Sequence, residues 1–152
     1  MNRQSPQFSS VPADLLPRLA ARGIDVLVLA LGLVGLGRIM GFGFDWLAVG
    51  TGIVLGYFVG LDALFGATLG KAAFGLRVVG PDGAPPTLRQ ALIRESFTVL
   101  GSIPFVGVLL AVGAWVWISL SIRRNELRQG KHDLLAGGTR VVRRSYAATE
   151  VV

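Results

Sequence analysis

Three long stretches of apolar residues dominate this chain and restrict its possible folds more than any other feature. The first runs from about Leu15 to Gly37, the second from Trp46 to about Gly66, and the third from Phe97 to Ile122. About 20 helical residues span a hydrocarbon core of roughly 30 Å. Because a backbone in lipid must satisfy its own hydrogen bonds, such segments cross a membrane as helices. The pattern therefore predicts an all-α integral membrane protein.

The composition supports the same fold class. Charged residues make up 16% of the chain and apolar residues 52%, whereas soluble domains average about 25% charged residues. The net charge is +6, but the cations flank the apolar blocks and do not form one basic face with interleaved aromatic residues. We therefore expect the lipid bilayer and its anionic headgroups as partners, at about 1 kcal/mol per cation near the surface, and no nucleic acid.

The third apolar block allows more than one arrangement. Pro104 lies inside it, and a proline within a helix removes a backbone hydrogen bond and clashes with the preceding turn. The block could be a single tilted crossing, a re-entrant hairpin, or parts of two helices, Leu88–Ser102 and Pro104–Ile122. In the last case Thr87 could cap the first of the two helices.

The distribution of Lys and Arg favours two crossings in this region. Cytoplasmic flanks of membrane helices carry an excess of these residues. The N-terminal flank, the middle segment Gly70–Arg94 and the C-terminal segment Arg123–Val152 are basic, whereas the turn Arg38–Asp45 holds one Arg and one Asp. A single third crossing would leave the C-terminal cations outside. We therefore predict a bundle of about four transmembrane helices, the third short and amphipathic, with both termini cytoplasmic.

The polar segments predict how the rest of the chain is organised. Residues 1–14 are expected to be a flexible polar tail, residues 15–144 the transmembrane domain, and residues 145–152 a C-terminal tail. Phe74–Val79 and Thr139–Arg144 share an Arg-Val-Val core, and each is too short to be a stable strand alone. We predict that they pair in a small cytoplasmic β-containing cap. The alternative is that the second segment belongs to a basic tail held only by lipid charge.

Charged residues in and beside the apolar blocks are the candidate functional residues. An ionised Asp at the centre of a membrane helix costs about 2.5–3.5 kcal/mol on insertion. Asp25 could be neutralised by Arg22, three residues away, or by Arg18, seven residues away on the same helix face. These charges could form an ion or proton site, or a salt-bridge cluster that fixes helix packing, and the residues alone favour the cluster. The full set is Arg18, Arg22, Asp25, Asp62, Arg94 and Asp133.

A stripe of glycines is a second candidate feature. Gly52, Gly56 and Gly60 recur every four residues in the second apolar block, a spacing that lets membrane helices approach closely. We interpret the stripe as a packing surface within the bundle, with dimerisation as the alternative.

No set of residues predicts catalysis or metal binding. The chain has no cysteine, which excludes thiolate metal sites and cysteine nucleophiles. Its one histidine, His132, stands next to Asp133 without a nucleophile or a metal-ligand set. We therefore expect no metal, no cofactor and no enzymatic activity.

Three segments together form a recognisable set of motifs, Arg18–Leu29 (RLAARGIDVLVL), Thr68–Val79 (TLGKAAFGLRVV) and Lys131–Val142 (KHDLLAGGTRVV). In this order they resemble the RDD family of small bacterial membrane proteins, named for an arginine and two aspartates. The resemblance identifies these residues as Arg18, Asp25 and Asp133. The last motif differs slightly, because it has Gly137-Gly138 where one glycine is usual.

The resemblance runs from about Arg18 to Arg144 and implies a multi-pass protein of the bacterial plasma membrane. The biochemical role of the family is largely unsettled, and transport of an unidentified ligand has been suggested for it. We hypothesise a transport-related protein, ion- or proton-coupled, in which Asp25 or Asp62 binds the ion. A small bundle would need to form a homo-oligomer for alternating access. The alternative is a non-transporting scaffold or assembly factor that packs against other membrane proteins.

Overall fold

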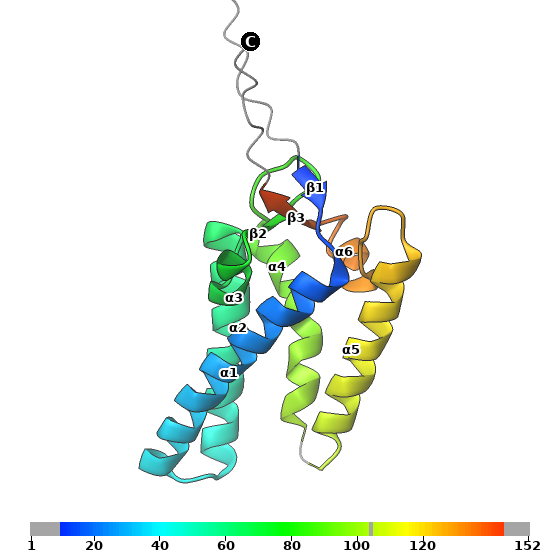
Figure 1. The fold of residues 1–152 in the computed structure, drawn as a ribbon. Helices are drawn as coiled ribbons and strands as arrows, with labels where there is room; N and C mark the ends of the chain where they lie inside the picture. The colour runs from blue at the N-terminus through cyan, green and yellow to red at the C-terminus, as the bar shows by residue number, and fades with distance from the viewer. Residues whose placement is uncertain (1–9, 104, 145–152) are drawn as a thin grey trace, which may run out of the picture.

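A computed structural model describes residues 10–103 and 105–144, and it has a helical bundle beneath a small sheet (Figure 1). The long helices form two hairpins whose turns lie at the end of the bundle away from the sheet. The first hairpin is α1 (Leu15–Met40) and α2 (Phe44–Phe65). The second is α4 (Leu88–Glu95), continued by the 3-10 helix η1 (Ser96–Ser102), and α5 (Gly107–Arg124).

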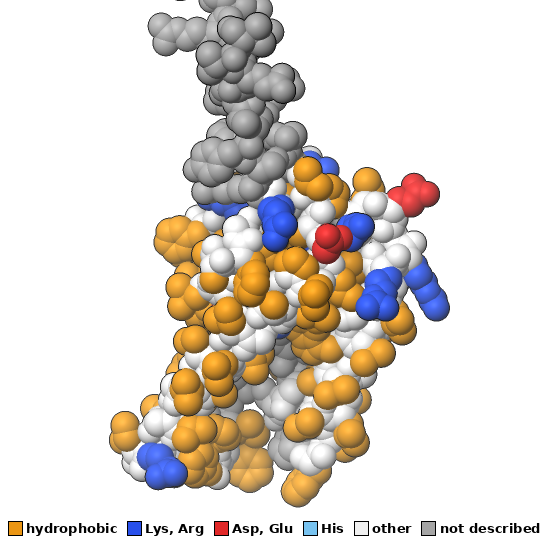
Figure 2. All heavy atoms as spheres, viewed as in Figure 1, with side chains coloured by type: hydrophobic (Ala, Val, Ile, Leu, Met, Phe, Trp, Pro, Cys, Tyr) orange, Lys and Arg blue, Asp and Glu red, His pale blue; other side chains and the backbone are white. Residues whose placement is uncertain are grey.

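Three of these helices are long and apolar enough to cross a membrane. Among the described residues they are α1, α2 and α5. Their outward faces carry exposed large apolar side chains, such as Leu31, Ile39 and Leu109, and Figure 2 shows apolar side chains over the sides of the bundle. Soluble monomers rarely expose apolar surface on this scale. The predicted membrane-type helical fold is therefore supported, although with three such helices and not the predicted count of about four.

The predicted break in the third apolar block is confirmed. Helical structure stops at Ser102 and starts again at Gly107, while Pro104 itself lies outside the described residues. A Cβ on Gly107 would lie 2.6 Å from the backbone oxygen of Gly101, so the turn is too tight for a side chain there. As predicted, Thr87 caps α4, since its hydroxyl accepts a hydrogen bond from the Gln90 backbone N–H.

The sheet joins the two polar segments that share the Arg-Val-Val core. Strand β2 (Leu76–Val79) pairs antiparallel with β3 (Arg140–Arg144), and Val78 lies opposite Val141. This confirms the predicted pairing. Both valines are buried with Ala21 of α1 in one apolar core, so the sheet is fixed directly to the first long helix.

A third strand was not predicted. Residues 1–14 were expected to be a tail, but Ser10–Pro12 forms β1 on the other edge of β3, which gives the strand order β1-β3-β2. A free edge of β3 would leave backbone groups unpaired, and β1 satisfies them although, at three residues, it is too short to be recognised from its sequence. The remaining tail residues, 1–9 and 145–152, lie outside the described part.

Candidate functional site

Charged side chains gather inside the bundle, close to the sheet. We call these residues the ion-pair network; they are Arg18, Arg22, Asp62, Lys71, Arg94, Glu95 and Asp133. They come from α1, α2, the short helices α3 (Leu69–Ala73) and α6 (Lys131–Leu135), and α4. The three carboxylates of the network are almost fully buried, so each must be compensated by a partner.

Arg94 is the central residue of this network. Its side chain is only 4% exposed and bonds to the Asp133 carboxylate. Its Nε lies 3.7 Å from both an Asp62 oxygen and a Glu95 oxygen. One guanidinium therefore links carboxylates from α2, α4 and α6.

Two further cations complete the pairing of these acids. Lys71 Nζ donates to both Asp62 oxygens, at 2.7 and 2.6 Å. Burial lowers the pKa of Lys71 below its usual value, although Asp62 acts in the opposite direction. Arg22 donates to Glu95 at 2.9 Å, and its guanidinium carbon lies 3.5 Å from the centre of the Phe58 ring, within the range of a cation–π contact.

Asp25 is satisfied in a different way from the one predicted. Its oxygens accept hydrogen bonds from the Tyr57 hydroxyl at 2.7 Å, the Thr68 hydroxyl at 2.5 Å and the Gly70 backbone N–H at 2.7 Å. The hypothesis that Arg18 or Arg22 neutralises it is wrong. Both arginines point to other carboxylates, and donors from α2 and the α3 region reach Asp25 first. Asp25 therefore anchors α3 to α1.

The structure brings five of the six predicted charged residues into the ion-pair network and separates the sixth, Asp25. Sequence reasoning missed four residues. Lys71 and Glu95 belong to the ion-pair network, and Tyr57 and Thr68 donate hydrogen bonds to Asp25. Thr68 and Lys71 stand in the TLGK start of the middle motif, and Glu95 follows Arg94 directly, so these positions carried a signal. Tyr57 lies in the middle of an apolar helix and carried none.

The glycine stripe does not pack inside the bundle. Gly52 and Gly56 are exposed and Gly60 is half-buried. A Cβ built at any of the three would have no heavy atom within 4 Å from the described residues outside its own helix. The interpretation of the stripe as an internal packing surface is therefore wrong, because this side of α2 faces outward, and α4 and η1 pack elsewhere on the helix.

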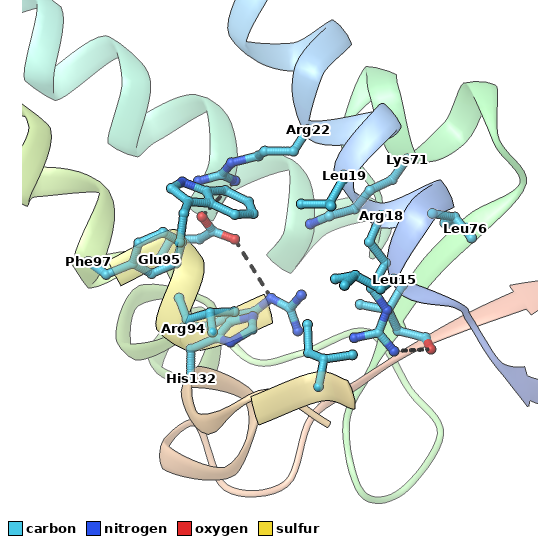
Figure 3. Close-up of a pocket in the computed structure, with 14 residues that line it drawn as sticks. Leu15, Arg18, Leu19, Arg22, Lys71, Leu76, Arg94, Glu95, Phe97 and His132 are labelled. Atoms are coloured by element: carbon cyan, nitrogen blue, oxygen red, sulfur yellow. Dashed lines mark hydrogen bonds and ion pairs between the residues drawn. The ribbon is translucent and has the colours of Figure 1, made fainter. Parts of the chain in front are cut away.

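A small cavity of about 50 Å³ lies against the network, between α1, α4 and α5 (Figure 3). Charged and polar side chains line one part of it, among them Arg18, Arg94 and His132. The rest of the wall is apolar and includes Leu15, Leu19, Leu76, Trp115, Ile118 and Ile122. The cavity can therefore hold a group with one polar and one apolar side.

His132 gives this region a pH dependence. Burial, with help from Arg94, lowers the pKa of His132 from 6.5 to about 4, against the attraction of Asp133. Between these values the unfolded chain binds a proton at His132 that the folded chain does not, so stability should fall by about 2–3 kcal/mol as the pH drops from 6.5 to 4. Thermal unfolding midpoints in detergent over this range test the expectation. The His132→Gln variant should lose this part of the slope, and an unchanged slope would contradict it.

The long apolar helices, the apolar outer surface and the buried ion pairs define a membrane-type protein. The chain belongs to the RDD family, whose model matches residues 12–137. The resemblance found in the three motifs is thereby confirmed. No curated protein and no solved structure matches the chain significantly. Within the described ranges, no cluster of three or more His, Cys, Asp or Glu side chains could hold a metal ion.

Proposed function

We propose that this RDD protein is transport-related, coupled to protons or another ion, and that it is not an enzyme. The observation that carries the proposal is the buried ion-pair network beside a cavity between long apolar helices. Ionisable residues at membrane depth are costly and commonly mark ion or proton pathways. The Asp62–Lys71 pair is the part of the network best suited to exchange a proton, because Lys71 Nζ lies 2.6 Å from Asp62 Oδ2 and both side chains are buried.

We also propose that the chain crosses the plasma membrane of a bacterium four times. Together, α4 and η1 extend about 26 Å at their standard rises, close to the roughly 30 Å of a hydrocarbon core. The sheet that joins β1 and β3 keeps both ends of the described chain on one side of the bundle. Basic residues near the sheet would then meet anionic headgroups on the cytoplasmic side.

Reporter fusions test this orientation. We expect a reporter that is active only in the periplasm to stay silent after Val152 and to give a signal when inserted in the Gly41–Gly43 turn. This result follows from the excess of cations at the sheet end. A strong periplasmic signal from the fusion after Val152 would contradict the four-crossing topology.

Flux in liposomes tests the transport proposal. The purified wild-type protein is reconstituted, and proton and ion movement are followed across a panel of cations, anions and pH gradients. We expect flux that Asp62→Asn abolishes and Asp45→Asn leaves unchanged, since Asp45 is an exposed residue at the far end of α2. Absence of wild-type flux with every ion would contradict the proposal.

A non-transporting scaffold is the second candidate function. The outward-facing Gly52 and Gly56 favour it, because small residues on an exposed membrane helix allow close contact with another helix. The partner would be a second copy of this chain or another membrane protein. Crosslinking through cysteines introduced at these two positions would support the scaffold if it captured one defined partner and flux were absent.

A further inference from the structure

The cavity is bordered by buried nitrogen atoms that lack hydrogen-bond partners. Within the described residues, the buried side-chain nitrogen and oxygen atoms without a hydrogen-bond partner include Arg18 Nε and Nη1, Arg94 Nε and His132 Nδ1. The Arg18 side chain is only 9% exposed and that of Arg94 only 4%. Buried polar groups are nearly always hydrogen-bonded, so nitrogens without partners around one cavity need an explanation.

The nearest carboxylates lie beyond hydrogen-bond distance of these guanidinium nitrogens. Arg94 Nε is 3.7 Å from both an Asp62 oxygen and a Glu95 oxygen, close enough for ion pairs only. Arg18 Nη1 lies 3.6 Å from an Asp133 oxygen, which is longer than a hydrogen bond. Asp133 is already engaged by Arg94, by Thr139 and by the Gly130 backbone N–H. All of the unpartnered atoms described above are nitrogens and none is a carboxylate oxygen. The guanidinium nitrogens among them can only donate hydrogen bonds, so the missing ligand is an acceptor and not a cation.

The three side chains come from three different helices. Arg18 comes from α1, Arg94 from α4 and His132 from α6, and Figure 3 shows them around the same space. Nitrogens from three helices suit a tetrahedral phosphate group better than a planar carboxylate, since its oxygens point in several directions. Guanidinium groups are also the preferred partners of phosphate in proteins.

We infer that the cavity binds a phosphate group, held by Arg18, Arg94 and His132, with any attached apolar chain lying along Leu19, Ile118 and Ile122. A volume of about 50 Å³ exceeds the roughly 10–15 Å³ that one water needs. The phosphate belongs either to a lipid from the bilayer or to a free anion. The inference rests on the proposed function insofar as it names the ligand class of the same site.

Binding to the purified full-length protein in detergent tests this inference. Trp115 lines the cavity, so its fluorescence should report occupancy, and Trp115→Phe identifies its share of the signal. The probes are inorganic phosphate, short-chain phosphatidic acid, and short-chain diacylglycerol, which has the same tails without phosphate. We expect a saturable response to at least one phosphate probe and none to diacylglycerol. Binding of inorganic phosphate would assign a free anion, and binding of phosphatidic acid alone would assign a lipid.

A pair of charge-matched variants tests the residues. Arg18→Gln should weaken phosphate binding about tenfold or more, because it removes charge-assisted hydrogen bonds. Arg89→Gln removes the same charge from an exposed position on α4 and should have no effect. Equal weakening by both variants would overturn the inference, as non-specific attraction would then explain binding. If Arg18→Gln does not fold, the wild-type protein still provides the test. Equal responses to phosphatidic acid and diacylglycerol, without a response to inorganic phosphate, would overturn the phosphate site.

The two proposals fail in distinguishable ways. Proton or cation flux in liposomes, together with no response to either phosphate probe, would overturn the phosphate site and leave the proposed function standing. Saturable, Arg18-dependent phosphate binding without flux of any ion would overturn transport and support the site. Equal responses to phosphatidic acid and diacylglycerol, without a response to inorganic phosphate, would mean that only the apolar wall binds.

Discussion

Replacing Asp133 with alanine is expected to lower the free energy of unfolding by about 3–5 kcal/mol, because it leaves a buried cation without its main partner. Asp133 is fully buried. Burial alone would raise its pKa, but Arg94, His132 and Arg18 together hold the pKa of Asp133 below its usual value. The carboxylate also accepts a hydrogen bond from the Gly130 backbone N–H at 3.0 Å, so its loss would weaken the start of α6 as well.

A double-mutant cycle separates the ion pair from these other effects. Adding Arg94→Met removes the cation that Asp133→Ala leaves behind, so the double variant should lose less stability than the two single losses added together. We expect a coupling of about 1–3 kcal/mol. Unfolding by SDS in mixed micelles, followed by circular dichroism, provides the measurement. Asp45→Ala, at an exposed position, should change stability by less than about 0.5 kcal/mol.

Additive losses in this cycle would contradict the prediction. They would mean that Asp62 and Glu95, each 3.7 Å from Arg94 Nε, compensate the arginine fully without Asp133. The strongest support for the ion pair would be a loss of stability in Asp133→Ala that the added Arg94→Met reverses.

The positions of the long helices were predictable from the sequence for a simple physical reason. A bilayer tolerates few charges within a span, so apolar blocks and their polar ends fix helix boundaries. Helix α1 starts at the predicted Leu15, and α2 starts two residues before the predicted Trp46. The pairing of β2 with β3 was predictable because both contain the same Arg-Val-Val core.

The partners of the buried charges were not predictable in the same way. Spacing along a helix suggested that Arg22 would neutralise Asp25, but Arg22 points to Glu95 and Phe58. Which carboxylate an arginine meets depends on how helices distant in sequence are packed. The prediction that the glycine stripe packs inside the bundle was wrong for the same reason. Regular spacing shows which residues share a helix face and does not show what lies against that face.

Gly70 is the position where we expect the second large effect, since α3 and α1 approach most closely there. A Cβ on this residue would overlap the backbone carbonyl of Ala21 and lie 2.9 Å from Cγ of Asp25. The conflict involves backbone and a buried carboxylate, so a rotamer change cannot relieve it. An alanine at Gly70 must therefore push α3 away from α1.

This shift would break the contacts that hold α3 in place. The 2.7 Å hydrogen bond from Gly70 N–H to Asp25 would lengthen, and the adjacent Lys71 would move away from Asp62. We expect Gly70→Ala to cost about 3 kcal/mol or more, from overpacking together with the loss of a bond to a charged group. Because alanine favours helix over glycine by about 1 kcal/mol, local propensity acts against this loss and cannot produce it.

Gly56→Ala is the matched control. It makes the same substitution in a helix, at a position where a new Cβ meets no heavy atom within 4 Å from the described residues outside that helix. We expect it to be neutral or to stabilise by up to about 1 kcal/mol. Unfolding by SDS in mixed micelles compares both variants with the wild type. If Gly70→Ala were as stable as Gly56→Ala, the close approach of α3 to α1 would be wrong, and with it the geometry that positions Lys71 in the ion-pair network.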